Sequence, residues 1–326
     1  MTERKLRKAR FSFVNYRLVI ALVLFTTVSS YFLMRARAVL FSAAVEAENG
    51  TRTVGAQVVM DQTASNKQAV QFVSDCVSGE CMPVGDLPGW QQIFTDDFKT
   101  DVTVGSFPGA VAQKWKAYPF DACFWQDTSK QGHYWPEKTL SVAQGLLNIY
   151  VHTENGPLCG GGSGPIHAVS APYPVLPGAS ANNGQQYGRY AVRFRSDPIA
   201  GYKVAWLLWP DSEQWPRDGE IDFPEGNLDG KITAFMHRMN GTSGSDQDGY
   251  ATSASFTAWH TAVIEWRPND LQFILDGQVI GHSTSRVPST PMHWVLQTET
   301  NLDGTPVSDS AAGNVQVDWV AVWKML

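Results

Sequence analysis

The sequence predicts an all-β fold for most of the chain. From Gly89 onward, short runs rich in Val, Ile, Phe, Tyr and Trp alternate with clusters of Gly, Pro, Asn and Asp, a pattern typical of strands joined by turns. No long run at the helical period interrupts them. About 240 residues of strands is a normal size for a single β-sandwich. The clearest expected strands are residues 146–152, 190–195, 203–209, 232–236, 262–266, 271–275 and 315–322.

Three further segments precede this expected domain, which we bound at residues 88–326. Residues 1–17 are basic, and residues 18–34 form an uncharged, mostly apolar run near the lower limit for a bilayer span. We expect an N-terminal hydrophobic helix that anchors the chain in the cell membrane, with the body outside. A cleaved signal peptide and secretion are the alternative, although nearby arginines fit cleavage poorly. Residues 35–87 indicate a stalk or linker.

Charge is unevenly distributed along the chain. The net charge is −6, yet residues 1–37 carry eight basic side chains against one acid, a sum of +7, which leaves −13 on the rest. An acidic body argues against nucleic acid as a partner. We expect the protein to be a monomer.

The four cysteines are Cys76, Cys81, Cys123 and Cys159. Their spacing does not match a zinc site, so we predict no metal centre built on them. An even number of cysteines in an exported protein is compatible with disulfides. Of the three possible connectivities we favour Cys76–Cys81 with Cys123–Cys159, and free buried thiols are the alternative.

Candidate functional residues concentrate at residues 218–226, DGEIDFPEG. Glu220 and Asp222 lie two apart, so they share one face of an extended strand. Glu225 joins that face if a one-residue bulge follows Asp222, a defect at which Pro224 is tolerated. Three crowded carboxyl groups leave one protonated at neutral pH, as an acid and nucleophile pair requires. Glycosidases use such a pair, and a solvated acidic turn is the alternative.

This stretch resembles the ExDxxE signature of glycoside hydrolase family 16, the laminarinase and endo-β-1,3(4)-glucanase group. The resemblance extends over about residues 88–326. It implies a concanavalin-like β-jelly-roll sandwich of two packed antiparallel sheets, with a substrate cleft across the concave face. The other matching segments, in chain order, are FTDDF at 94–98, YGRYAVRFR at 187–195, WLL at 206–208, WP at 215–216, WHTAVIEW at 259–266, DG at 276–277 and VQVDWV at 315–320.

The resemblance also implies a role for each acid. Glu220 corresponds to the nucleophile, Asp222 to the residue that tunes it, and Glu225 to the general acid/base of a retaining double displacement. The residues expected to bind substrate are Trp206, Trp215, His237, Arg189, Gln297 and Glu299. For Trp206 a place in the core is an equal alternative.

Departures from the family pattern leave the specificity open. Tyr202-Lys203 stands where the family usually has Trp-Pro, and the segment that contains Gln297 and Glu299 replaces a common Leu-Asn pair. We expect an endo-acting glycoside hydrolase for β-1,3- or mixed β-1,3/1,4-glucan. The alternatives are a hydrolase or transglycosylase that processes an exopolysaccharide of the same cell, and a non-catalytic lectin-like sandwich.

No cofactor is expected to be required, although the resemblance is compatible with a structural calcium ion. The sequence SDQDG at residues 245–249 resembles a fragment of a calcium loop. It lacks the full pattern of such a loop, so a solvated turn is the favoured interpretation.

Overall fold

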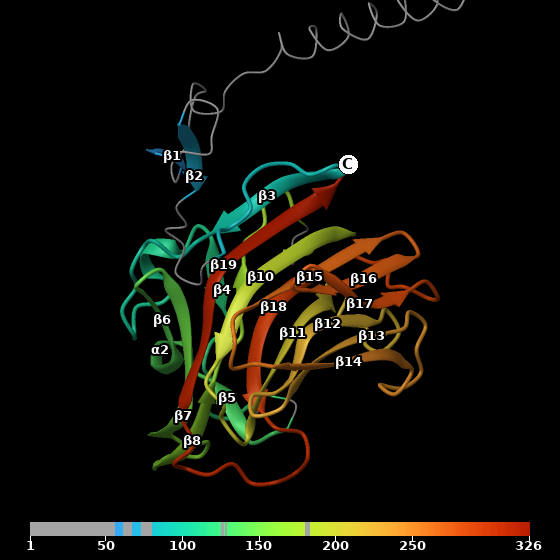
Figure 1. The fold of residues 1–326 in the computed structure, drawn as a ribbon. Coiled ribbons are helices and arrows are strands. Elements are labelled where there is room, and N and C mark those ends of the chain that lie inside the picture. Colours follow the sequence, from blue (N-terminus) through green and yellow to red (C-terminus); the bar gives the residue numbers. More distant parts are fainter. Residues whose placement is uncertain (1–55, 61–66, 73–79, 125–126, 128, 180–182) are drawn as a thin grey trace, which may run out of the picture. The chain divides into compact units, whose positions relative to one another are not determined.

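The computed structural model describes residues 56–60, 67–72, 80–124, 127, 129–179 and 183–326. The chain divides into two compact units, residues 1–74 and 75–326. In the first unit the described residues form one antiparallel pair, β1 (Ala56–Met60) and β2 (Gln68–Phe72), within a stretch that we expected to be linker (Figure 1). The expected hydrophobic helix at residues 18–34 lies outside the described residues. Within the described ranges, no helix is long and apolar enough to cross a membrane.

The second unit is built almost entirely of strands, which confirms the all-β prediction (Figure 1). Each expected strand lies within an observed one. The larger sheet has ten strands. In spatial order they are β17 (Gln278–Ser283), β16 (Asp270–Leu275), β15 (His260–Arg267), β10 (Gly188–Ser196), β19 (Gly313–Met325), β7 (Leu146–Pro157), β8 (Ser163–Val169) and β5 (Gly132–Tyr134), with β3 (Trp90–Asp96) beside β19 and β6 (Leu140–Ala143) beside β7.

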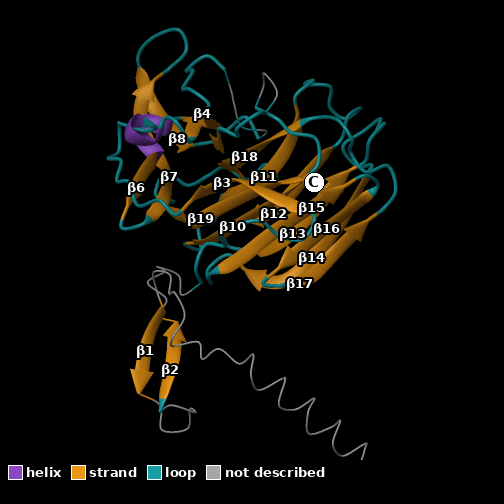
Figure 2. Cartoon of the chain, turned by 90° about the horizontal axis from the view of Figure 1, so that it is seen from above, coloured by secondary structure: helices purple, strands orange, loops and turns teal. Residues whose placement is uncertain are grey.

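The smaller sheet has five strands and packs face to face on the larger one (Figure 2). Its spatial order is β14 (Gln247–Ser255), β13 (Lys231–His237), β12 (Glu220–Asn227), β11 (Tyr202–Pro210) and β18 (Met292–Thr300). Aromatic rings from both sheets meet in the core. The ring of Trp206 lies 5.1 Å from that of Phe194, and the rings of Phe223 and Phe273 are 5.5 Å apart. The side of the small sheet that faces away from this core is therefore free to carry a site.

Short elements complete the unit. They are η2 (Gly109–Val111), α2 (Pro136–Thr139) and the two-stranded pair of β4 (Trp115–Ala117) with β9 (Pro172–Pro174). The expectation of purely antiparallel sheets is wrong at one place, because β5 runs parallel to β8. Parallel pairing needs a long connection between the strands, and here the chain returns through α2, β6 and β7.

One of the two expected disulfides is present. Cys123 and Cys159 are bonded, with their Cα atoms 4.6 Å apart. The pairing of Cys76 with Cys81 stays a prediction, because Cys76 lies outside the described residues.

Residues 80–87, expected as the end of the stalk, pack instead on the larger sheet. The indole N–H of Trp319 donates to the carbonyl oxygen of Glu80, and that of Trp323 donates to the carbonyl of Gly85, both at 2.9 Å. The Glu80 carboxylate also accepts from Arg193 at 2.7 Å. Buried indole N–H groups usually find such partners, and here residues 80–87 supply them, so the expected domain boundary at residue 88 falls too late.

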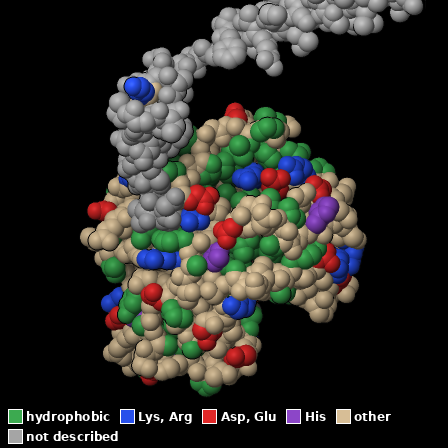
Figure 3. Space-filling model, in the orientation of Figure 1, with side chains coloured by type: hydrophobic (Ala, Val, Ile, Leu, Met, Phe, Trp, Pro, Cys, Tyr) green, Lys and Arg blue, Asp and Glu red, His purple; other side chains and the backbone are tan. Residues whose placement is uncertain are grey.

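The face of the molecule drawn in Figure 3 shows no single-sign charged surface among its coloured residues. Lys and Arg side chains lie among Asp and Glu side chains there. On this face, therefore, the coloured residues present no continuous basic stripe of the kind that follows a nucleic-acid backbone.

Candidate active site

The three acids of β12 project to the same side of the small sheet because the strand is bulged. Asp222 lies opposite Phe235 of β13, and Glu225 lies opposite Thr233. Three steps along β12 therefore match two steps along β13, and the register with β11 shifts at the same place. Phe223, inside the bulge, turns into the core. The one-residue bulge that strand parity required is confirmed.

The acids line a cleft of about 290 Å³ on the side of the small sheet away from the core. A second hollow of about 400 Å³ continues it and shares Lys203, Glu225, Phe235 and Leu302 with the first. The cleft is thus elongated and crosses several strands. Its lining residues are Lys203, Ala205, Leu207, Trp215, Glu220, Asp222, Glu225, Phe235, His237, Gly244, Gln247, Gln297, Glu299 and Leu302.

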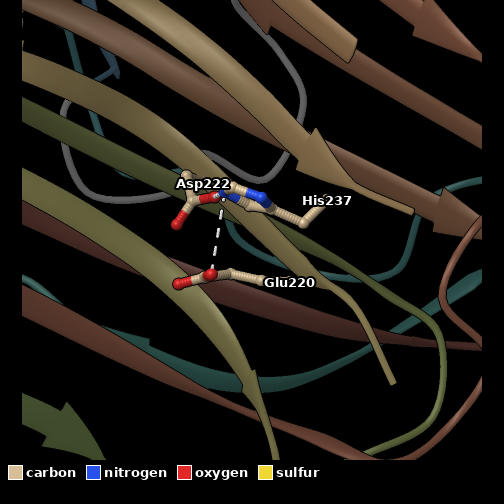
Figure 4. A group of neighbouring side chains, drawn as sticks. All are labelled: Glu220, Asp222 and His237. Atoms are coloured by element: carbon tan, nitrogen blue, oxygen red, sulfur yellow. Dashed lines mark ion pairs between the residues drawn. The ribbon is translucent and has the colours of Figure 1, made fainter. Parts of the chain in front are cut away.

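Glu220, Asp222 and His237 all line this cleft, and their side chains point toward one another (Figure 4). His237 Nε2 lies 3.7 Å from Glu220 Oε2 and 3.5 Å from Asp222 Oδ2. Both carboxyl groups are buried, with Glu220 8% and Asp222 2% exposed. Among the described residues this is the group that could hold a metal ion, with ligand atoms within 4.8 Å of one another.

Burial gives the two central acids unusual protonation behaviour. It raises the pKa of Glu220 to about 7, against a hydrogen bond from Asp222 and with the help of the negative charge on Glu225. Burial also raises the pKa of Asp222 well above its usual value, and the charges of Glu220 and Glu225 add to this effect. The pair titrates jointly, with Asp222 holding the proton that it donates to Glu220. Such proton sharing suits acid–base chemistry better than it suits binding a cation.

His237 remains neutral beside this pair at neutral pH. Burial lowers its pKa, while a hydrogen bond with the Gly244 backbone and the charge on Glu225 act in the opposite direction. A neutral imidazole does not neutralise the carboxylates, so it contributes to the shape and polarity of the cleft rather than to its charge.

Glu225 has a different environment, because it forms an ion pair with a lysine. Lys203 Nζ lies 2.7 Å from Glu225 Oε1 and 3.2 Å from Glu299 Oε1. Sequence reasoning noted Lys203 only as a departure from the family pattern and did not assign it to the site. The signal was available, since Lys203 is two residues before Ala205 and two residues on a strand share a face.

Four of the expected substrate-binding residues line the cleft: Glu299, His237, Trp215 and Gln297. Trp215 is 40% exposed, and its ring lies nearly parallel to that of Trp209, at 6.3 Å and 16°. Gln297 accepts a hydrogen bond from the Tyr134 hydroxyl. Tyr134 was not expected near the site, because it lies 163 residues from Gln297 in the chain, whereas Trp209 is close to Trp215 in the sequence and was simply not assigned a role.

Trp206 and Arg189 do not lie in the cleft, and their expected substrate contacts do not hold. Trp206 is fully buried in the core, since its neighbours Ala205 and Leu207 occupy the cleft side of β11. Arg189 lies on β10 of the other sheet, where it pairs with Glu265 at 3.0 Å and covers the Trp323 ring. Strand alternation turns Trp206 away from the cleft, and Arg189 is excluded because its strand belongs to the sheet that does not line the cleft.

The candidate calcium fragment is occupied by ion pairs. Asp246 accepts from both Arg238 and Arg286, and Asp248 pairs with Arg238. These arginines already neutralise the two carboxylates. The expected solvated turn covers only the start of this segment, because residues 247–249 already belong to β14 and both acids are ion-paired.

Comparison with known proteins identifies the domain. Residues 167–321 match the family model for glycosyl hydrolases family 16. This part of the chain belongs to that family. The match includes the bulged β12 and its three acids, and also most of the strands that form the cleft.

The family 16 domain is similar to curated and structurally characterised glucanases. A β-glucanase of Bacillus amyloliquefaciens is 25% identical over 124 residues, which cover 38% of this chain and 50% of that protein. The chain thus spans about half the length of this curated relative. The catalytic domain of an endo-1,3-β-glucanase (laminarinase) from Thermotoga petrophila RKU-1 superposes with a TM-score of 0.58 at 19% identity, over 74% of this chain and 99% of that one.

A second solved structure, LamA from Z. galactanivorans in complex with laminaritriose and laminaritetraose, gives a TM-score of 0.57 at 19% identity. It covers 72% of this chain and 98% of that one. At these identities the two structures establish a shared fold, which is the predicted jelly-roll sandwich.

Proposed function

We propose that this family 16 domain is a retaining, endo-acting glycoside hydrolase that cleaves β-1,3- or mixed β-1,3/1,4-glucan. The observation that carries the proposal is the bulged strand β12, which directs three acids of different environment into one elongated cleft. An open cleft accommodates a polymer along its length, so cleavage inside a chain follows from the shape. A binding module has no comparable need for three crowded carboxyl groups.

The environments of the acids support distinct roles. Glu220 attacks the anomeric carbon while Glu225 gives its proton to the leaving glycosidic oxygen, which forms a glycosyl-enzyme. Glu225 then takes a proton from water, which attacks the same carbon and releases Glu220 with retained configuration. The hydrogen bond from Asp222 stabilises the Glu220 carboxylate before attack and after release. No proton is gained or lost over the whole cycle beyond hydrolysis of the bond.

The cleft also supports a neutral sugar polymer as substrate. Its acids outnumber its lysine, so an anionic polysaccharide would be repelled. Trp215 offers a half-exposed aromatic face on which a sugar ring can stack. The printed names of the similar proteins, β-glucanase and laminarinase, agree with a β-glucan.

We also propose that the domain works outside the cytoplasm. The Cys123–Cys159 disulfide supports this, because disulfides persist in oxidising compartments. An anchor at residues 18–34 would hold the enzyme at the cell surface, and a cleaved signal would release it. Detection of residues 1–34 in the mature protein by mass spectrometry distinguishes the two.

The proposed reaction is tested with Glu220→Gln and Glu225→Gln on laminarin and mixed-linkage glucan, with the anomeric configuration of the first product followed by NMR. We expect wild type to yield the β-anomer first, and each variant to lose at least about a thousandfold in kcat/KM. Glu225→Gln should keep more activity on aryl glycosides whose leaving group needs no proton, whereas Glu220→Gln should not.

Glu137→Gln is the matched control, since Glu137 is exposed on α2 and outside the cleft lining. Its kcat/KM should equal that of wild type. A wild-type protein that binds these polymers without cutting them would instead indicate the lectin-like alternative, and first release of the α-anomer would contradict retention.

A further inference from the structure

The lysine that faces the proposed acid/base is shared between two carboxylates. Lys203 on β11 lies between Glu225 of β12 and Glu299 of β18, the strands on either side of it. The side chains of Lys203 and Glu299 are 6% and 2% exposed, and that of Glu225 is 17% exposed. The three charges therefore form a buried row across the floor of the cleft, with the ammonium in the middle.

A buried lysine keeps its charge only when its partners compensate for lost hydration. Burial opposes the charge on Lys203, but the carboxylates of Glu299 and Glu225 outweigh it and raise the pKa of the lysine. The ammonium is therefore a fixed charge at every pH at which the acids titrate. The ammonium interacts with both carboxylates, so its ion pair with Glu299 weakens its ion pair with Glu225, and the reverse also holds.

The proposed reaction makes opposite demands on Glu225. It must carry a proton when the glycosidic bond breaks, and it must be an anion when it accepts a proton from water. A lysine paired with Glu225 alone would oppose the first state. A carboxylate facing Glu225 without the lysine would oppose the second.

We infer that Lys203 and Glu299 are positioning residues that together set the protonation balance of Glu225. Lys203 favours the anion that acts as base, and Glu299 moderates this by competing for the same ammonium. The inference rests on the proposed role of Glu225. The family usually has Trp-Pro at residues 202–203, and the inference explains why this chain has Tyr202-Lys203 instead: the lysine tunes the reaction.

Other titratable or charged groups near this row come from β12, β13, β5 and the loop after β18. The variants below leave these groups in place, so their charges are the same in every comparison. These groups are Glu220, Asp222, His237, Lys231, Tyr134 and Asp303.

The inference predicts that two substitutions move the pH dependence in opposite directions. In Glu299→Gln the lysine pairs with Glu225 alone, so the alkaline limb of the kcat/KM profile should move to lower pH. In Lys203→Met two carboxylates face each other without a cation, so that limb should move to higher pH. Each shift should be on the order of one pH unit, the usual effect of one nearby charge.

Two further variants separate tuning from support of the fold. Lys203→Arg keeps the cation and should leave the limb close to wild type. Lys138→Met removes a lysine that pairs with Glu154 away from the cleft lining, and it should change nothing in the profile. If Lys203→Met does not fold, Glu299→Gln and Lys203→Arg still test the inference.

A readout without substrate distinguishes this inference from the proposed function. In protein with ¹³C-labelled glutamate carboxyl groups, the Glu225 signal is assigned by its absence in Glu225→Gln and followed from pH 3 to 10. Relative to wild type, its titration should move down in Glu299→Gln and up in Lys203→Met. A chain that titrates in this way but cuts no polymer would refute the proposed function alone. Shifts in the same direction, or lower rates with an unmoved limb and titration, would overturn the inference.

Discussion

Glu220 and Asp222 lie two residues apart on β12, and burial leaves both with a raised pKa. Glu220 keeps its proton in the folded state up to about pH 7. Above that pH it is ionised in a buried site, which lowers the free energy of unfolding. In the unfolded chain the same group ionises near pH 4.3. The site therefore costs stability at the pH at which it works, as is common for groups tuned for catalysis.

This cost gives a prediction for Glu220→Gln. Between about pH 4.3 and 7 the folded wild type binds more protons than the unfolded chain, so its stability falls as pH rises. The variant lacks this proton, so it should gain stability over wild type at pH 8 and not at pH 4. The gain should reach up to about 3 kcal/mol. Urea denaturation at both pH values measures it.

Glu137→Gln, at an exposed position on α2, is again the control. Its stability change relative to wild type should be the same at pH 4 and pH 8. A Glu220→Gln variant with equal stability change at pH 4 and pH 8 would mean that Glu220 ionises normally in the fold.

At the scale of the element, strand alternation separates the tryptophans that hold the fold from those that face the cleft. Trp206 is fully buried against Phe194, and its neighbours on β11 line the cleft. Trp215 precedes β12 and is 40% exposed beside Trp209. The two tryptophans carry the same side chain and should behave oppositely when removed.

We therefore predict that Trp206→Ala destabilises the domain by about 3–5 kcal/mol, the usual cost of removing a large core ring. Trp215→Ala should change stability by less than about 1 kcal/mol and raise KM for glucan, because it removes a surface on which sugar stacks. Chemical denaturation and steady-state kinetics measure the two effects. A large loss of stability in Trp215→Ala, or none in Trp206→Ala, would contradict this assignment of faces.

The bulge in β12 shows how far an element can be predicted from its own residues. The spacing of Glu220, Asp222 and Glu225 required one extra residue if all three were to share a face, and the strand has it. The same local reasoning could not place Arg189 or Trp206. Trp206 lies on a strand buried on two sides, where alternation defines two faces but not which one meets the cleft, and Arg189 lies on the sheet that does not line the cleft.

At the scale of the whole molecule, residues 80–87 belong to the sandwich unit. Carbonyl groups of this segment accept hydrogen bonds from Trp319 and Trp323, and the Glu80 carboxylate accepts from Arg193, whose side chain is 11% exposed. The two tryptophans form a second apolar cluster with Trp90, separate from the main core. The segment thus supplies acceptors to the indole N–H groups of Trp319 and Trp323 and a carboxylate to Arg193, which also donates to Thr261.

This predicts different behaviour for chains that begin at residue 75 and at residue 88. Residues 88–326 should melt several degrees lower than residues 75–326, because two indole N–H groups lose their acceptors and Arg193 loses its carboxylate partner Glu80. Their tryptophan emission should also shift to longer wavelength and become easier to quench with acrylamide. Both chains contain an even number of cysteines, so an unpaired thiol does not complicate the comparison. Equal melting and equal emission would mean that residues 80–87 add nothing to the domain.

The amino-acid sequence by itself determined the all-β class, the position of each clear strand, the bulge and the identity of the three acids. These features depend on periodicity and spacing within one segment, which side-chain alternation makes visible. Only the tertiary structure decided which faces meet, that Lys203 lies between Glu225 and Glu299, and that residues 80–87 cover tryptophans of the larger sheet. Those contacts depend on the spatial order of strands distant in the chain. Sequence spacing does not fix that order, because the pairing energy comes from burial and hydrogen bonds that form only after the sheets assemble.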